Sequence, residues 1–325
     1  MKLSIVVPVY NVEQYVRKCI LSIINQDDDL FKDIELIVVN DGTKDKSVEQ
    51  IQDLVNQNDN IIFINQENQG LSVARNNGMA SAKGDYVWFV DSDDWITADA
   101  LKVLLPHLDG KNDLVPFAYT MVTEDKETLC CAFFDEPKTF TGKETFRRKC
   151  EFATMAQRAA YRKEFLTKHK LSFMPGIYSQ DDELCIRASY LAETVTILPQ
   201  TIYYFLRTTG DKHKSIMNAG KPKYGFDYIA VTKSLLNFKR ERVKEDDFSK
   251  RFDYHISVLI NNGLNTISRC SKDDQTKFCN MYRDVNGLNR CLWGGGGKYA
   301  LEAILFMLFP NKIVQSYNLL KRFKH

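Results

Sequence analysis

The sequence has no long hydrophobic run, no paired cysteine motif and no marked excess of one charge. Its longest apolar run, Ala303–Phe309, is far shorter than the ~20 residues that a membrane-spanning helix needs. The 325 residues include 44 Lys+Arg and 42 Asp+Glu, and a net charge of +2 gives no reason to expect nucleic acid as a partner. These absences argue against a membrane-spanning protein and against a polyanion-binding one.

The eight cysteines form no C-x-x-C pair with a matching partner, so we expect no structural zinc and a reduced protein. We expect no signal peptide, because Met1–Asn11 runs directly into a strand-like segment. After that segment the sequence also lacks the G-x-G-x-x-G loop of dinucleotide-binding oxidoreductases and the basic Gly-rich loop of nucleotidyltransferases. We therefore expect a cytoplasmic protein, either free in solution or peripheral at the inner face of the cell membrane.

Strand-like and helix-like segments alternate over the first hundred residues. The expected strands are Leu3–Val9, Glu35–Val39, Ile61–Ile64 and Tyr86–Val90. The expected helices are Glu13–Asn25, Ser47–Val55 and Leu71–Ala82. Unbroken apolar strands separated by helices predict an α/β fold, with a Rossmann-like, mostly parallel sheet flanked by helices.

The remainder of the chain is less regular. We expect residues 142–169 to be mostly helical, residues 181–191 to form a helix and residues 197–204 a strand. Helical patterns continue from Tyr224 onward. The predicted organisation is a catalytic domain over residues 1–220, followed by a helical C-terminal region over residues 221–325.

Polar and acidic residues follow the predicted strands, where ligands bind in parallel sheets. Asp91 and Asp93 form a D-x-D pair directly after the fourth strand, and such carboxylates can hold Mg²⁺ or Mn²⁺. The same residues would also suit an acidic turn that caps the next helix. Asp41 lies in an Asp-Gly turn, and Arg75 lies on a predicted helix where it could simply be solvated.

Four segments, in this order, resemble the motifs of family 2 glycosyltransferases of the GT-A fold. They are Ile5–Asn11, Val38–Asp45, Asn68–Gly78 and Gly84–Asp94. The resemblance implies that Asp93 binds a divalent metal, Mn²⁺ or Mg²⁺, and that Asp91 is a second ligand nearer the ribose. It also implies that Pro8, Val9 and Tyr10 line the base pocket and that Asp41 accepts a hydrogen bond from the base. The nucleotide-sugar-binding residues implied in full are Pro8, Val9, Tyr10, Asn11, Asp41, Arg75, Asp91, Ser92, Lys212 and His213.

The general base of this family usually lies in an acidic motif well after the D-x-D pair. Residues 180–187 fit its spacing, which points to Asp181, while Asp182 leaves the register ambiguous. Acidic residues also suit a helix N-terminus for electrostatic reasons alone. A basic loop over residues 207–215, with Lys212 and His213, is either a lid over the diphosphate or a solvated loop.

The resemblance implies an inverting glycosyltransferase that uses a nucleotide-diphospho-sugar, UDP-linked in our reading, and acts in bacterial surface polysaccharide synthesis. The acceptor would be a glycan or a lipid-linked molecule, and the oligomeric state stays open. A metal-dependent phosphoester or diphosphate hydrolase is the rival enzyme class, because clustered carboxylates would serve it too. A non-catalytic sugar-nucleotide binding module would keep the nucleotide contacts without needing Asp181.

The segment Lys298–Phe309 is apolar, and basic residues follow it at Lys312 and residues 321–324. An interfacial helix with an anionic-lipid-binding tail fits this composition. A terminal helix packed on its own domain fits it equally well.

Overall fold

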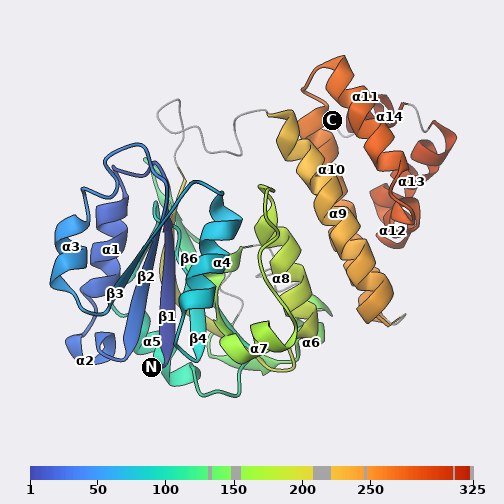
Figure 1. Cartoon of the computed structure of the whole chain (residues 1–325). Helices are drawn as coiled ribbons and strands as arrows, with labels where there is room; N and C mark the ends of the chain where they lie inside the picture. Colours follow the sequence, from blue (N-terminus) through green and yellow to red (C-terminus); the bar gives the residue numbers. More distant parts are fainter. Residues whose placement is uncertain (131–133, 148–154, 208–220, 245–246, 310–311, 323–325) are drawn as a thin grey trace. The chain divides into compact units, whose positions relative to one another are not determined.

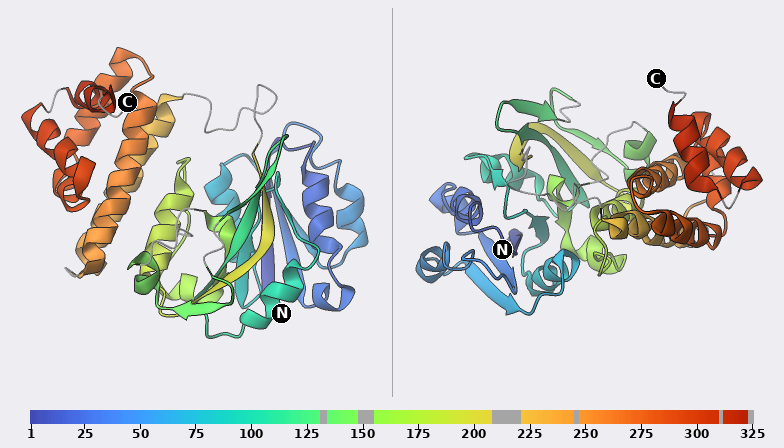
Figure 2. Two further views of the ribbon diagram at one scale, coloured as in Figure 1. Left: turned by 180° about the vertical axis from the view of Figure 1, so that it is seen from behind. Right: turned by 90° about the horizontal axis from the view of Figure 1, so that it is seen from above.

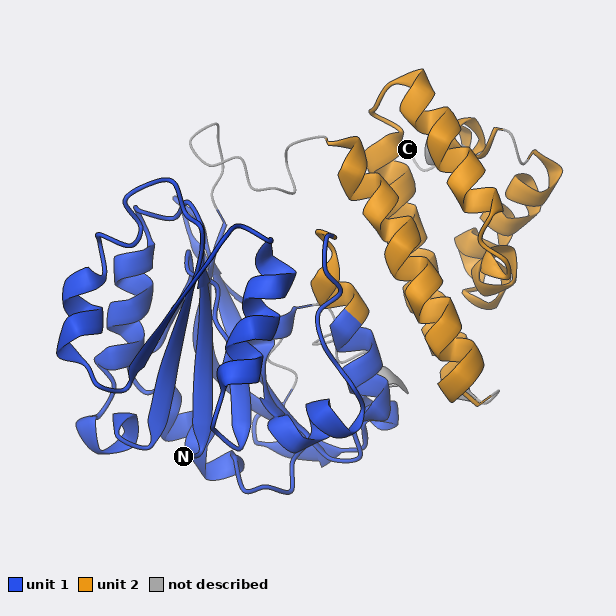
Figure 3. Ribbon diagram, viewed as in Figure 1, with its two compact units in different colours: residues 1–176, 184–213 blue, residues 177–183, 214–325 orange. Residues whose placement is uncertain are grey.

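The computed structural model describes residues 1–130, 134–147, 155–207, 221–244, 247–309 and 312–322 (Figure 1). The chain divides into two compact units (Figure 3). The first comprises Met1–Gly176 and Leu184–His213, and the second Ile177–Glu183 and Lys214–His325. The division falls within helix α8 (Gln180–Leu191), so that the first turn of this helix belongs to the second unit. The domain boundary between residues 220 and 221 stays a prediction.

The described part of the first unit is built on a single mixed sheet. Its strands are β1 (Leu3–Val9), β2 (Ile34–Asp41), β3 (Ile61–Gln66), β4 (Tyr86–Phe89), β5 (Trp95–Ile96), β6 (Leu114–Val122), β7 (Glu127–Cys130), β8 (Lys138–Phe140), β9 (Ala159–Arg162) and β10 (Val195–Leu206). The strand order is β3-β2-β1-β4-β9-β6-β10-β5, with β7 paired to β6 and β8 to β10.

The half of the sheet that contains β3, β2, β1 and β4 is entirely parallel, as the sequence predicts. Its strands are buried on both faces: in β1, Ile5 and Val7 belong to one apolar core and Val6 to the other. A strand buried on both sides needs apolar residues at consecutive positions, which explains the unbroken run in the sequence. The predicted fold class is confirmed.

Helices cover both faces of this sheet, which Figure 2 shows from behind and from above. They are α1 (Val16–Ile24), α2 (Asp28–Phe31), α3 (Gln52–Gln57), α4 (Leu71–Ser81), α5 (Ala100–Leu104), α6 (Gly142–Arg147) and α7 (Lys163–Lys168), with short 3₁₀ turns η1 (Leu105–His107) and η2 (Ala156–Arg158). Helices α1 and α5 contribute to one core, through residues such as Ile20 and Leu104. Helices α4, α7 and the later turns of α8 contribute to the other, through Ala74, Phe165 and Ala188.

The expectation that residues 142–169 are mostly helical is wrong for Ala159–Arg162. These residues form β9, which pairs antiparallel with both β4 and β6 and so joins the parallel half of the sheet to the rest. Alanine favours a helix by intrinsic propensity, yet here the small side chains of Ala159 and Ala160 are buried between neighbours. Tertiary packing therefore overrides the local preference.

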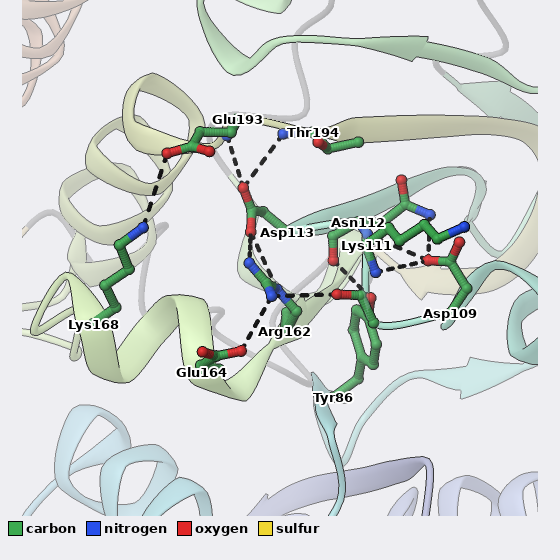
Figure 4. Close-up of polar contacts among 11 residues, drawn as sticks. Tyr86, Asp109, Lys111, Asn112, Asp113, Arg162, Glu164, Lys168, Glu193 and Thr194 are labelled. Atoms are coloured by element: carbon green, nitrogen blue, oxygen red, sulfur yellow. Dashed lines mark hydrogen bonds and ion pairs between the residues drawn. The ribbon is translucent and has the colours of Figure 1, made fainter.

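An ion pair between the buried Asp113 and the partly buried Arg162 stabilises this second half of the sheet (Figure 4). Arg162, at the end of β9, donates to Oδ1 of Asp113 from Nη2 at 2.5 Å and from Nε at 3.2 Å. The other oxygen of Asp113 accepts hydrogen bonds from the backbone N–H groups of Glu193 and Thr194, at 2.7 and 3.3 Å. One carboxylate thus joins the residue before β6, the end of β9 and the residues before β10.

The second unit is helical in its described residues. Beyond the first turn of α8 it contains α9 (Pro222–Arg242), α10 (Asp247–Ile267), α11 (Lys272–Arg283), α12 (Leu288–Gly294), α13 (Gly297–Leu308) and α14 (Ile313–Arg322). Helices α9 and α10 approach closely at Gly225, where a Cβ atom would lie 2.4 Å from Cγ1 of Ile267. No helix among the described residues combines the length and the apolar character needed to cross a membrane.

Candidate active site

The carboxyl ends of β1, β2 and β4 lie side by side, because β1 pairs in parallel with both neighbours. The register sets Val9 opposite Asn40, and the backbone N–H of Val90 donates to the carbonyl of Val6 at 3.0 Å. The residues that follow these strands therefore share one edge of the sheet. This edge holds the D-x-D pair, Asp41 and the Tyr10-Asn11 turn.

Three carboxylates gather after β4. Asp91, Asp93 and Asp94 each offer an oxygen, and these oxygens all lie within 4.8 Å of one another. Loss of hydration within the cluster, together with the charge of Asp91, raises the pKa of Asp93 to about 6, although part of this residue is exposed. Burial, followed by the charges of Asp93 and Asp91, raises the pKa of Asp94 well above its usual value. A hard divalent cation would relieve this repulsion, and an all-oxygen donor set suits Mg²⁺ or Mn²⁺.

Two side chains hold Asp91 in a fixed orientation. Nη2 of Arg75 lies 2.5 Å from Oδ1, and Nε2 of Gln157 donates to Oδ2 at 3.0 Å. Arg75 is 1% exposed, and its guanidinium also lies 5.0 Å from the centre of the Phe173 ring. The sequence points to Arg75 as a nucleotide contact; the structure brings it to Asp91, and the nucleotide contact stays a prediction.

Asp94 is the member of the cluster that sequence reasoning missed. It is buried, and its oxygens accept hydrogen bonds from the Tyr203 hydroxyl at 2.5 Å and from the Leu206 backbone N–H at 2.8 Å. The Tyr203 hydroxyl in turn accepts a hydrogen bond from the backbone N–H of Asp91, at 3.3 Å. The adjacent Asp93-Asp94 pair was the available signal. Nothing in the sequence pattern points to Tyr203 or to Gln157.

Asp41 is 3% exposed at the end of β2, and it fastens the loop before α4. Its Oδ1 accepts hydrogen bonds from Nε2 of Gln66 and from the backbone N–H of Gln69, both at 2.8 Å. Its Oδ2 accepts from the backbone N–H of Gly70 at 2.9 Å. A carboxylate has about four lone-pair positions, so one more donor can be accommodated. Base recognition by Asp41 is compatible with these contacts and stays a prediction.

The remaining N-terminal site residues differ in exposure. Pro8 and Val9 are buried in β1, Ser92 is buried, and Tyr10 is 41% exposed. Asn11 adopts a left-handed backbone conformation, with φ of 55°. Its backbone N–H donates to Oγ1 of Thr43 at 2.8 Å, which ties the β1 turn to the β2 turn. The proposed basic residues Lys212 and His213 lie outside the described residues.

Asp181 and Asp182 lie in the first turn of α8, within the second unit. Burial, and then the charge of Asp181, raises the pKa of Asp182 to about 7. The next acidic residue, Glu183, is buried and accepts a hydrogen bond from the Ser234 hydroxyl at 2.6 Å. Glu183 therefore joins the first turn of α8 to α9 within the second unit, while Asp181 and Asp182 remain the candidates for a base.

The sequence model described as Glycosyl transferase family 2 matches residues 4–168, which include β1 to β4, the acidic cluster and Gln157. The chain belongs to glycosyl transferase family 2. One relative of this glycosyltransferase is the putative glycosyltransferase EpsH of Bacillus subtilis (strain 168). The two are 30% identical over 275 residues, which cover 81% of this chain and 77% of EpsH.

Two solved structures share the fold of the glycosyltransferase. TarS of Staphylococcus aureus, a poly(ribitol-phosphate) β-N-acetylglucosaminyltransferase, is 24% identical over 287 residues, which cover 87% of this chain and 49% of TarS (strain MW2). Residues 1–349 of S. aureus TarS with UDP-GlcNAc superpose with a TM-score of 0.68 at 19% identity, covering 98% of this chain and 88% of that one. The mannosyltransferase PcManGT of Pyrobaculum calidifontis, in complex with GDP-Man and Mn²⁺, superposes with a TM-score of 0.51 at 13% identity. The match covers 95% of this chain and 87% of PcManGT.

Proposed function

We propose that this glycosyltransferase moves a sugar, with inversion, from a UDP-linked donor to an acceptor hydroxyl. The observation that carries the proposal is the cluster of Asp91, Asp93 and Asp94 at the carboxyl edge of the parallel strands, next to the buried Arg75. The complex of TarS with UDP-GlcNAc supports a UDP-linked donor, since its fold covers nearly the whole of this chain.

Each of these residues has its own role in the proposed donor site. Asp93 holds a divalent cation, and Asp91 contributes a second oxygen close to the ribose. When bound, Mn²⁺ or Mg²⁺ neutralises charge on the departing diphosphate. Arg75 and Gln157 keep the Asp91 carboxylate in one rotamer, so that little reorganisation is needed as the donor binds. The complex of PcManGT with GDP-Man and Mn²⁺ supports a metal in this role.

Inversion at the anomeric carbon requires a base that takes the proton from the acceptor hydroxyl, on the face opposite the leaving group. We assign this role to Asp181 or Asp182. The register of the acidic motif favours Asp181, whereas the pKa of about 7 suits Asp182 for proton transfer near neutral pH. The bond to the diphosphate breaks as the new glycosidic bond forms, and the acceptor proton passes to the carboxylate.

The acceptor that we propose is a hydroxyl on a glycan or a lipid-linked molecule in bacterial surface polysaccharide synthesis. Support comes from relatives of this chain that are named as poly(ribitol-phosphate) glycosyltransferases. Side chains in the loops of the second half of the sheet would select the particular sugar and linkage.

The test is a calorimetric titration of UDP and of GDP into the full chain, with and without Mn²⁺. We expect UDP to bind in a metal-dependent way and Asp93→Ala to abolish that dependence. Asp125→Ala removes an exposed carboxylate outside the cluster and is the matched control. Failure of a folded protein to bind either nucleotide would refute the donor assignment and favour the hydrolase alternative.

A second measurement separates catalysis from binding. Asp181→Asn and Asp182→Asn are compared in a transfer assay and in the same titration. The variant that lacks the base should lose transfer by about 10²- to 10⁴-fold while UDP affinity is retained. Loss of UDP binding in both variants would point to a structural role for this turn of α8. Full transfer activity in both variants would remove the base assignment altogether.

A further inference from the structure

Helix α13 has two apolar faces, and only one of them is buried among the described residues of the second unit. Tyr299, Ala303 and Phe306 are buried at intervals of three and four residues, which places them on one side of the helix. On the same side the buried carboxylate of Glu302 accepts a hydrogen bond from Nδ2 of Asn261, on α10, at 2.6 Å. This inner face is what a terminal helix packed on its own domain, one of the two interpretations of the sequence, would have.

The outer face of α13 is formed by Leu301, Ile304 and Leu308, which are 48%, 38% and 64% exposed. At 3.6 residues per turn these three side chains lie about opposite the buried ones. Met307 and Phe309, 56% and 49% exposed, extend the apolar surface toward the end of the helix. Single exposed apolar residues are common on soluble proteins, but a contiguous group of this kind marks an interaction surface.

The charges of this part of the chain are almost all positive. From residue 287 to the C-terminus the only acidic residue is Glu302, and its carboxylate is buried against Asn261. The basic residues of the same stretch are Arg290, Lys298, Lys312, Lys321, Arg322 and Lys324. Lys298 and Lys312, the two basic residues next to α13 in the sequence, are both exposed. In the sequence the outer face is therefore bounded by lysines at both ends, and Nζ of Lys298 lies 4.6 Å from the centre of the Tyr299 ring. The one acidic side chain of the stretch, Glu302, is buried on the inner face.

We propose that the outer face of α13 binds the surface of a bilayer that contains anionic lipids. Apolar side chains would enter the boundary between headgroups and acyl chains, and the lysines at either end would contact anionic headgroups. A second copy of the chain fits less well, because it would bring the same positive charges together across the interface. The inference does not rest on the donor or the acceptor of the proposed function.

The test is co-sedimentation of the full chain with phosphatidylcholine vesicles, with and without phosphatidylglycerol. Wild type should bind the anionic vesicles about tenfold or more tightly than the neutral ones, and the preference should weaken with added salt. The combined variant Leu301→Ser, Ile304→Ser and Leu308→Ser should bind the anionic vesicles about tenfold or more weakly than wild type. Lys298→Glu with Lys312→Glu should remove the preference for anionic lipid.

Leu129→Ser is the matched control, because Leu129 is 61% exposed on β7 in the other unit, and it should leave vesicle binding unchanged. All variants should keep the circular dichroism spectrum and the UDP affinity of wild type, since the substituted side chains are exposed. Absence of binding by folded wild type, or equal binding by the Ser variant, would overturn the proposal. So would a wild-type dimer in sedimentation velocity that the Ser variant abolishes, because the occupant of the face would then be a second copy.

Discussion

The substitution Asp93→Asn should have opposite effects on stability with and without metal. In the metal-free protein Asp93 is one of three carboxylates whose oxygens lie within 4.8 Å of one another. Removing its charge removes the cost of keeping this carboxylate away from water and then the repulsion from Asp91, so the variant should be more stable than wild type. With Mn²⁺ and UDP present the order should reverse, because the variant lacks the proposed metal ligand.

The size of the first effect follows from the pKa of Asp93, raised from 3.8 to about 6. A carboxyl group whose pKa is raised by folding favours the folded state at low pH, and this contribution is lost as the pH rises through about 6. A shift of about 2 units corresponds to about 3 kcal/mol, and solvent screening of this partly exposed side chain reduces it to about 1 kcal/mol. Without metal, the free energy of unfolding of the variant should therefore exceed that of wild type by about 1 kcal/mol at about pH 8, and the difference should vanish near pH 4.

Binding supplies the opposing effect. At metal and nucleotide concentrations about 100-fold above their dissociation constants, wild type should gain about 2.7 kcal/mol that the variant does not. Thermal unfolding followed by tryptophan fluorescence is a suitable assay, because Trp88 and Trp95 lie in the first unit on either side of the cluster in the sequence. Asp125→Asn should change neither measurement. A metal-free Asp93→Asn protein less stable than wild type at about pH 8, or one still stabilised by Mn²⁺ and UDP, would refute the reasoning.

Three further predictions concern other parts of the molecule. Asp113→Ala should destabilise the protein by about 2–4 kcal/mol in urea unfolding, because it removes the buried carboxylate that pairs with Arg162 and that accepts from the backbone N–H groups of Glu193 and Thr194; a loss below about 1 kcal/mol would contradict this. The transfer rate should rise through about pH 7 as Asp182 loses its proton, and this rise should disappear in Asp182→Asn if Asp182 is the base. Gly42→Ala should cost more stability than Gly110→Ala: both glycines have positive φ, but only at Gly42 would the new Cβ meet a backbone nitrogen, at 2.8 Å. Equal losses in the two variants would show that backbone conformation alone sets the cost.

The parallel half of the sheet could be predicted from sequence because its information is local. The unbroken apolar run of β1 and the acidic residues after β4 are each readable within a single segment. Because parallel strands end at the same edge of a sheet, Asp41 and Asp91 are expected at one edge, and ligands bind at that edge in such sheets. The structure bears out that arrangement.

The contacts that orient the acidic cluster could not be predicted, because they join residues far apart in the chain. Gln157 reaches Asp91 across 66 positions, and Tyr203 reaches Asp94 across 109. Neither contact leaves a periodic or local signal in the sequence. Gln157 also precedes β9, in a segment where the propensity of alanine favours a helix, so the sheet pairing that brings it near the cluster was hidden as well.

These long-range contacts affect how the proposed donor site is tuned. The carboxylates lie on the motif after β4 and Asp91 pairs with Arg75 on α4, but their orientation also depends on Gln157, in the turn η2, and on Tyr203, on β10. Because a carboxylate held by two donors keeps its rotamer, a change at Gln157 or Tyr203 would rotate or release an aspartate without altering any motif residue. Sequence differences around η2 and β10 should therefore alter binding at the proposed donor site while the four motifs stay the same. Substitutions that aim to change the donor should accordingly begin with Gln157 and Tyr203.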